Sequence, residues 1–410
     1  MSILRSLCIA SLAAIAMLGA VAGVHAQTAT VDDTAKFLAG MMPSADSPLT
    51  PLTREAAWQR HAKFFDTAFG QLEQRQISRI RAWADANLAS PKPVMFYMFS
   101  GPDFLYANAF HPRASTYVLS ALEPVGVVPD LTRLSRGGIA SALYNVERSL
   151  GSILSFSFFI TKDMKTDLQS GQISGTLPIL YVFLARSGMT VKSVGPVALD
   201  DKGAAYVAGE TPGTNVVRGV RIIFSGSDGQ DKTLYYFSTD LSNAGVKASG
   251  FLKFCETLGP GNSLIKSASY LLHEGNFSTV RSFLLNNSAS IIQDDSGIPL
   301  GYFNAKKWRF FPFGRYLGPI DKFPGLYQPS YAELFRRAQP VDFGIGYRWR
   351  THETNVLLSV KSPDDGSAGT GASASAEAPN PPPPPRRQKP RPPVDIGPQP
   401  RGGGDFFFWR

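Results

Sequence analysis

The chain has 410 residues, a formal net charge of +9 and 43% hydrophobic residues. This composition excludes a wholly disordered chain, because it supplies enough apolar surface for a large hydrophobic core. Its two cysteines, Cys8 and Cys255, exclude a scaffold held by several disulfides. The basic residues are scattered, so the positive charge indicates either attraction to anionic polymers or solubility alone.

The first 26 residues have the pattern of an export signal. Arg5 precedes an apolar stretch at residues 7–21, and Val-His-Ala ends at Ala26. The apolar stretch is shorter than the about 20 residues that span a bilayer, so we predict cleavage between Ala26 and Gln27. The mature chain is then periplasmic or secreted, carries a charge of +8 and has no intrachain disulfide, since Cys255 alone remains. We predict no transmembrane span in the mature chain.

A long helix is predicted early in the mature chain, after a lead-in at residues 27–52 with a short helix at 33–41. Thr53 is the expected cap, and large residues recur at spacings of three and four to residue 88. The stripe consists of Trp58, Ala62, Phe65, Phe69, Leu72, Gln76, Ile80 and Trp83. Gln76 is its only polar member. This pattern favours packing in the core over a cofactor site.

Residues 94–99 predict a central strand, because every position is apolar, as in a strand covered on both faces. Gly101 and Pro102 end it, and Asp103 precedes a short helix at 104–110. In open α/β sheets, ligands bind where a strand's carboxyl end meets a helix. A second strand at 116–122 indicates a tight parallel crossover or a hairpin with a long loop.

The remaining elements alternate without regular βαβ repetition. Further helices are predicted at residues 131–156, 161–187, 250–258, 263–274 and 278–287, with Pro178 kinking or dividing the second. Further strands are predicted at residues 191–199, 216–224, 232–239, 290–293, 302–311, 343–349 and 355–360. An Asp-Gly turn predicts a hairpin between the strands at 216–224 and 232–239. We therefore predict an α/β or α+β fold, a mixed sheet with flanking helices, over residues 27–361 in one large or two intimately packed domains.

The tail at residues 362–410 differs in composition. Eleven prolines lie between Pro379 and Pro400 together with basic residues, and the chain ends in Phe-Phe-Phe-Trp-Arg. Such a segment has little apolar surface to bury and is predicted to be disordered with polyproline II character. It either binds an anionic envelope polymer or a protein partner, or it has no specific partner.

Residues with catalytic potential are few. The histidines and cysteines lack metal-binding spacing, and the nucleophile-elbow, P-loop and dinucleotide motifs are absent, so no metal or cofactor is predicted. Ser100, Asp103 and His111 are expected near the carboxyl end of the central strand. Asp294 and Asp295, in an Asp-Asp-Ser-Gly turn, offer two carboxylates for a divalent cation or for acid and base roles. The alternative is that these residues only cap a helix or form a turn.

An aromatic cluster follows Asp294 and Asp295, and its candidate binding residues are Trp308, Tyr316 and Tyr327. Aromatic loops stack on sugar rings or docking peptides, whereas the alternative is a satellite core beneath a long loop. Basic neighbours would also suit single-stranded nucleic acid, which an exported protein rarely meets. The leading hypothesis is a periplasmic or cell-envelope binding or structural module, and the alternative is a periplasmic hydrolase that uses paired carboxylates. The sequence leaves open whether the protein is an enzyme.

Overall fold

The fold is built on one ten-stranded mixed sheet, seen in a computed structural model that describes residues 28–88, 91–159, 173–207 and 216–362. The strand order is β4-β3-β5-β6-β2-β1-β7-β8-β10-β9. The five central strands, β6 to β8 in that order, are parallel, and antiparallel strands extend both edges. The expected mixed sheet with flanking helices is confirmed, in the α+β form.

The strands are β1 (Val94–Met98), β2 (Thr116–Ala121), β3 (Thr190–Leu199), β4 (Ala205–Val207), β5 (Val217–Ser225), β6 (Asp231–Ser238), β7 (Gly261–Ile265), β8 (Ser288–Gln293), β9 (Trp308–Gly314) and β10 (Asn355–Lys361). The α-helices are α1 (Val31–Leu38), α2 (Ala56–Leu72), α3 (Ser78–Asn87), α4 (Phe104–Phe110), α5 (Arg136–Phe156), α7 (Leu177–Arg186), α8 (Asn243–Ala248), α9 (Phe251–Thr257), α10 (Ser278–Asn287) and α11 (Pro329–Phe335). Among the residues described, no helix combines the length and the apolar character needed to cross a bilayer.

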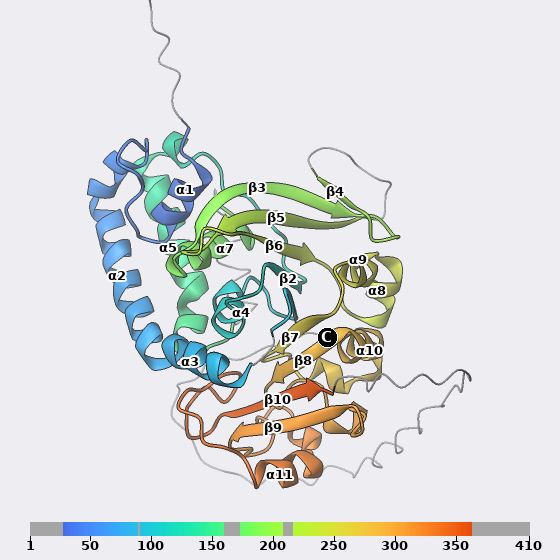
Figure 1. Cartoon of the computed structure of the whole chain (residues 1–410). Helices are drawn as coiled ribbons and strands as arrows, with labels where there is room; N and C mark the ends of the chain where they lie inside the picture. The colour runs from blue at the N-terminus through green and yellow to red at the C-terminus, as the bar shows by residue number, and fades with distance from the viewer. Residues whose placement is uncertain (1–27, 89–90, 160–172, 208–215, 363–410) are drawn as a thin grey trace, which may run out of the picture.

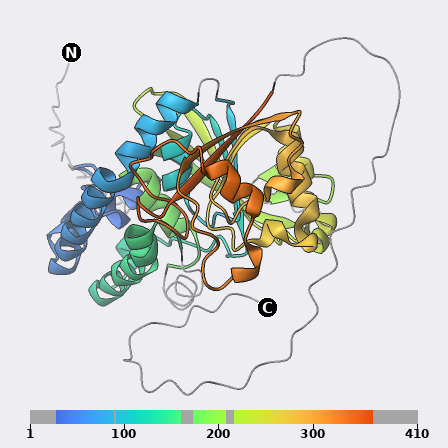
Figure 2. The ribbon, with the colours of Figure 1, turned by 90° about the horizontal axis from the view of Figure 1, so that it is seen from below.

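Helices cover both faces of the sheet. Helices α2, α3 and α5 lie on one side, and α8, α9 and α10 lie on the other (Figures 1 and 2). In β1, Met95 and Tyr97 belong to the core on the α2 side, and Val94, Phe96 and Met98 belong to the core on the α10 side. Because successive side chains of a strand point to opposite faces, a strand with two covered faces is apolar at every position, as residues 94–99 are.

The connection from β1 to β2 is a parallel crossover through α4. The predicted crossover is thus confirmed and the hairpin alternative is wrong. The predicted hairpin between β5 and β6 is also confirmed, with Gly229 at a φ of 70° after Asp228. Since β2 lies on one side of β1 while β7 and β8 lie on the other, the order of strands reverses at β1 and β7. This is the switch point at which open sheets bind ligands.

The helix predicted at residues 263–274 is wrong, because β7 occupies Gly261–Ile265 and short turns follow it. Asn262 and Ser263 made this segment look too polar for a central strand. In the sheet, the Ser290 hydroxyl donates to the Asn262 side-chain oxygen at 2.9 Å, and the Ser263 and Ser288 hydroxyls are 2.7 Å apart. Pairing between neighbouring strands therefore satisfies the buried polar groups.

The strand predicted at residues 343–349 is also wrong. This segment is a loop with one isolated bridge, and a Cβ at Gly344 would lie 1.9 Å from the Trp349 carbonyl oxygen. The strand expected at 302–311 begins only at Trp308. Thr53 is not the cap of α2, since it lies in the short helix η1 (Thr50–Arg54) and its hydroxyl donates to the Thr50 carbonyl.

Several predictions fall partly outside the described residues. The first part of the helix predicted at 161–187 does so, whereas α7 has Pro178 in its first turn and is buried from Leu177 to Ala185 as expected. The signal segment with its cleavage site at Ala26 and Gln27, and the tail at 363–410, also lie outside them. Helices α8 and α11 and strand β4 were not predicted. The division into domains stays a prediction.

Candidate functional site

Charged side chains meet at the carboxyl ends of three adjacent parallel strands. Asp103 follows β1, Lys266 follows β7 and Asp294 follows β8. An oxygen of Asp103 is 3.1 Å from the Lys266 ammonium nitrogen, and an oxygen of Asp294 accepts from the Ser267 backbone nitrogen at 3.1 Å. The fold therefore places the predicted carboxylates of Asp103 and Asp294 in contact with two consecutive residues, Lys266 and Ser267.

The Asp103–Lys266 ion pair is closed to solvent, since each side chain is 2% exposed. Asp103 also accepts from the Tyr97 hydroxyl at 2.8 Å and, as the cap of α4, from the Tyr106 backbone nitrogen at 3.1 Å. The Lys266 nitrogen donates to the Ser157 carbonyl and lies 4.1 Å from the centre of the Tyr106 ring. Every polar atom of this pair is engaged, which is the arrangement that makes a buried charge tolerable.

Asp294 and Asp295 point to different partners and are both buried. Asp294 also accepts from the backbone nitrogen of Ser296, and Asp295 accepts from the Tyr270 hydroxyl at 2.7 Å and the Asn355 amide at 3.0 Å. Burial raises the pKa of Asp294 to about 6, with a further contribution from the Asp295 charge, and burial also raises the pKa of Asp295. The two carboxylates thus hold the turn and its neighbours, and neither is exposed to a ligand.

Backbone strain is concentrated at the same edge. The non-glycine residues with positive φ in the described chain are Phe99, Ser157, Ser267, Ser269 and Tyr270. Phe99 directly follows β1, the last three follow β7, and Ser157 ends α5 and bonds to Lys266. Such conformations cost of order 1 kcal/mol or more each and gather at functional sites, where surrounding contacts hold them in place.

The other catalytic candidates lie elsewhere or face inward. The Ser100 hydroxyl donates to the Gly101 carbonyl and does not cap α4. The expectation that His111 lies near the carboxyl end of β1 is wrong, because α4 runs back along the sheet and His111 ends that helix before β2 begins. His111 is buried, neither ring nitrogen has a hydrogen-bond partner among the described residues, and burial lowers its pKa to about 3.

The aromatic candidates divide into core and surface. Trp308 is buried against Phe303, with ring centres 5.3 Å apart. Tyr316 packs on Tyr331 at 4.9 Å beside a small core, while Tyr327 is 53% exposed. Tyr316 therefore belongs to the satellite core that the sequence offered as the alternative, whereas Trp308 lies in the core on the α10 side and Tyr327 is on the surface.

A π turn interrupts the long amphipathic helix and contacts this edge through Tyr106. The turn η2 (Glu73–Ile77) joins α2 to α3 and places Gln76 in the core. Gln76 accepts from the Tyr106 hydroxyl at 2.7 Å and donates to the Gly344 carbonyl at 2.6 Å. Because π turns widen a helix locally and frequently occur at functional sites, the single polar residue of the stripe marks a feature of interest.

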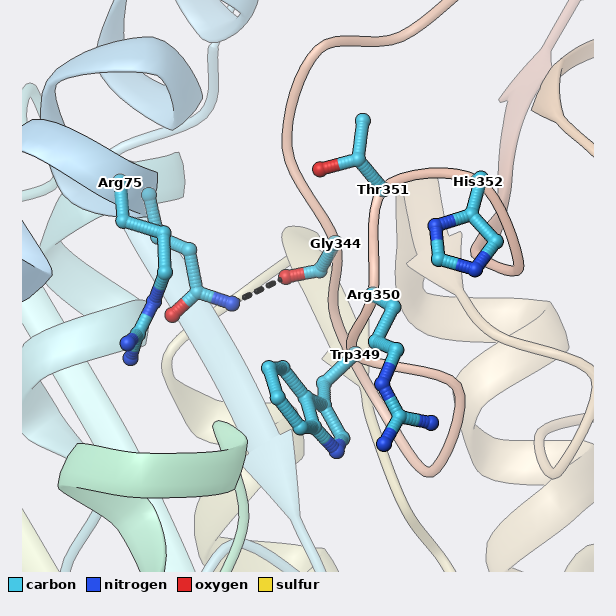
Figure 3. A pocket seen from close by; sticks show the side chains of 7 residues that line it. Arg75, Gly344, Trp349, Arg350, Thr351 and His352 are labelled. Atoms are coloured by element: carbon cyan, nitrogen blue, oxygen red, sulfur yellow. Dashed lines mark hydrogen bonds between the residues drawn. The ribbon is translucent and has the colours of Figure 1, made fainter.

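A pocket of about 290 Å³ opens between this turn and the loop before β10. Its lining residues are Arg75, Gln76, Gly344, Trp349, Arg350, Thr351 and His352. Figure 3 shows Arg75 on the helix side and Trp349 and Arg350 on the loop side, with the bond to Gly344 joining the two walls. Through Gln76 and Tyr106, the pocket adjoins the Asp103–Lys266 pair at the switch point.

Sequence reasoning did not find the pocket residues. Arg75 and the segment 349–352 carry no motif, and they are 274 or more positions apart in the chain. The one available signal was Gln76, alone among apolar residues on the helix face. Within the described part of the chain, no group of three or more His, Cys, Asp or Glu residues is arranged to hold a metal ion.

Comparisons with protein families, with curated proteins and with solved structures each find nothing similar. Functional inference therefore rests on the geometry of the chain's own residues.

Proposed function

We propose that this protein is an exported, periplasmic or cell-envelope binding module whose folded part binds its ligand in the pocket between η2 and the loop at residues 342–354. The export signal read from residues 1–26 supports the location. The basic, proline-rich tail would add a second contact, with an anionic envelope surface or a protein partner.

The observation that carries this proposal is the pocket's position beside the switch point, where parallel sheets bind ligands. Its wall is held in place, since Gly344 bonds to Gln76 and the Gly346 carbonyl accepts from the Ser157 hydroxyl at 3.3 Å. A preformed wall favours binding, because less conformational freedom is lost when the ligand enters.

The carboxylates at this edge support binding over catalysis. Asp103 and Asp295 already accept hydrogen bonds from buried tyrosines, and Asp294 accepts from the backbone of Ser267 and Ser296. A general acid or base must reach the proton that it transfers, and these groups are enclosed. One observation favours the hydrolase as a second candidate: Asp294 has a pKa raised to about 6, within the range of catalytic acids.

Hydrogen exchange on the mature chain tests the proposal. The probes are an anionic envelope polysaccharide and the same polysaccharide with its carboxyl groups reduced to neutral alcohols. We expect slower exchange at residues 73–77 and 342–354 with at least one probe, while the polysaccharide stays intact. Cleavage of the polysaccharide that is lost in Asp294→Asn would support the hydrolase, and no protection in the folded part would contradict the binding pocket.

A further inference from the structure

We propose that the pocket is a receptor for an oxyanion, so that its ligand carries a phosphate or carboxylate group next to an apolar or ring portion. This inference rests on the proposed binding function and names the chemistry of the ligand. The pocket joins two guanidinium groups, an imidazole, a hydroxyl and an indole, from Arg75, Arg350, His352, Thr351 and Trp349, and none of its lining residues is acidic.

Arg75 supplies cationic charge from the helix side. Its Nη2 atom donates to the Leu154 carbonyl at 2.8 Å, which fixes the guanidinium, while its Nε atom is buried without a partner. Arg75 forms no ion pair with any carboxylate of the described residues. A guanidinium in the lining of a pocket attracts a carboxylate or phosphate through its charge.

The π turn explains why Arg75 and Gln76 serve the pocket together. Gln76 turns inward to Tyr106 and Gly344, and its neighbour Arg75 lines the same opening. A regular helix places consecutive side chains about 100° apart, and the wider π turn changes that spacing locally. The hydrogen bond to Gly344 also fixes the distance between the helix and the loop, so Gln76 is a positioning residue for the site.

The loop side supplies the Arg350 guanidinium, which is only weakly paired. Glu353 lies 3.6 Å from an Arg350 nitrogen and 3.4 Å from His352 Nε2, and it does not line the pocket. Ion pairs at such distances near the surface contribute little to stability, so a ligand anion can replace Glu353 at little cost. Glu353 is therefore a competitor for the Arg350 guanidinium that the ligand would use.

Trp349 indicates which kind of group the ligand carries next to its anionic group. Its indole packs against Phe156, with ring centres 5.7 Å apart, and Arg350 lies 5.0 Å from the indole. The aromatic surface is fixed on one side by the protein and lines the pocket on another. A free inorganic ion would leave this surface unused, whereas an anionic sugar or a similar ring compound would cover it.

Calorimetric titration of the mature chain tests the inference with glucose 6-phosphate, glucuronate and glucose, which present a phosphate, a carboxylate and no charge on one ring. We expect binding of the first two and at least tenfold weaker binding of glucose. If only one of the two anions binds, the result identifies whether the ligand carries a phosphate or a carboxylate. Equal binding of all three, or of glucose alone, overturns the oxyanion receptor.

Variants that each remove one charge test the residues assigned to the pocket, and one further variant is a control. Arg350→Gln, in a side chain 55% exposed, should weaken anion binding about tenfold or more, and Glu353→Gln should strengthen it severalfold. Arg336→Gln, which removes the same charge from a side chain 76% exposed and paired with Glu333, is the matched control and should change nothing. Equal losses in Arg336→Gln and Arg350→Gln, or no change in either, would overturn the assignment. Arg75→Gln is an additional variant, accompanied by an unfolding curve because its guanidinium also bonds to Leu154.

The failure of this inference and the failure of the proposed function give different results. If the neutral polysaccharide protects residues 342–354 in hydrogen exchange and no anion binds in the titration, the pocket binds a ligand that is not an oxyanion. If neither experiment detects a ligand in the folded part, both the pocket and the oxyanion are wrong.

Discussion

Replacing Lys266 with methionine should destabilise the protein strongly, because it leaves a lone carboxylate in the core. Lys266 and Asp103 are each 2% exposed and 3.1 Å apart. Removing one partner of such a pair costs about 3–5 kcal/mol, since the remaining charge keeps its desolvation penalty without compensation. Asp103 would keep its bonds from Tyr97 and Tyr106, so we expect a loss near the lower limit, about 3 kcal/mol.

The assay is urea unfolding of the mature chain at pH 7, followed by tryptophan fluorescence and circular dichroism. A double variant, Asp103→Asn with Lys266→Met, removes both charges and should recover at least half of the loss, because no unpaired charge remains. The control is Lys36→Met, in a side chain 33% exposed and paired with Asp32, where we expect a change within about 0.5 kcal/mol. A loss below about 1 kcal/mol in Lys266→Met, or full additivity in the double variant, would refute this account of the buried pair.

Three further predictions concern buried titrating groups and the tail. Folding raises the pKa of Asp294 from 3.8 to about 6, so the folded state binds a proton more tightly and this carboxyl lowers stability as pH rises from about 4 to about 6. The free energy of unfolding of Asp294→Asn in urea, relative to that of the wild type, should therefore rise over this pH interval. A difference between the two proteins that does not change with pH would contradict the expected direction. Folding lowers the pKa of His111 from 6.5 to about 3, so this group costs stability as pH falls below about 6.5. His111→Phe should lose less stability than the wild type on acidification to pH 4, whereas parallel losses would count against it. Deletion of residues 362–410 should leave the melting temperature unchanged in calorimetry, and a fall of many degrees would show that the tail packs on the fold.

The elements that the sequence predicted best are those in which local pattern and tertiary environment agree. The apolar run at residues 94–99 predicted β1, and α4 and α10 were predicted with the bounds that the structure has. The Asp-Gly turn correctly predicted the hairpin of β5 and β6. In these segments, the apolar residues and the turn residues that determine the structure lie close together in the sequence. They can therefore be recognised without knowledge of tertiary contacts.

Strand β7 was missed because its polar residues are satisfied only by another strand. Asn262 and Ser263 bond to Ser290 and Ser288 of β8, which follow them by more than 20 residues. Because β7 was not predicted, neither the switch point nor the position of Lys266 at the end of β7 could be predicted. The partner of Asp103 could therefore not be named from the sequence.

The sequence by itself determined the export signal pattern, the class of fold, the central strand and the choice of Asp103 and Asp294 as candidate residues. Tertiary structure alone decided that Asp103 pairs with Lys266, that His111 lies away from the carboxyl ends of the strands and that Arg75 and Arg350 line one pocket. The physical reason is that periodicity records whether a side chain is buried, whereas the partner of a buried or facing polar group depends on strand order and on loops brought together from distant parts of the chain.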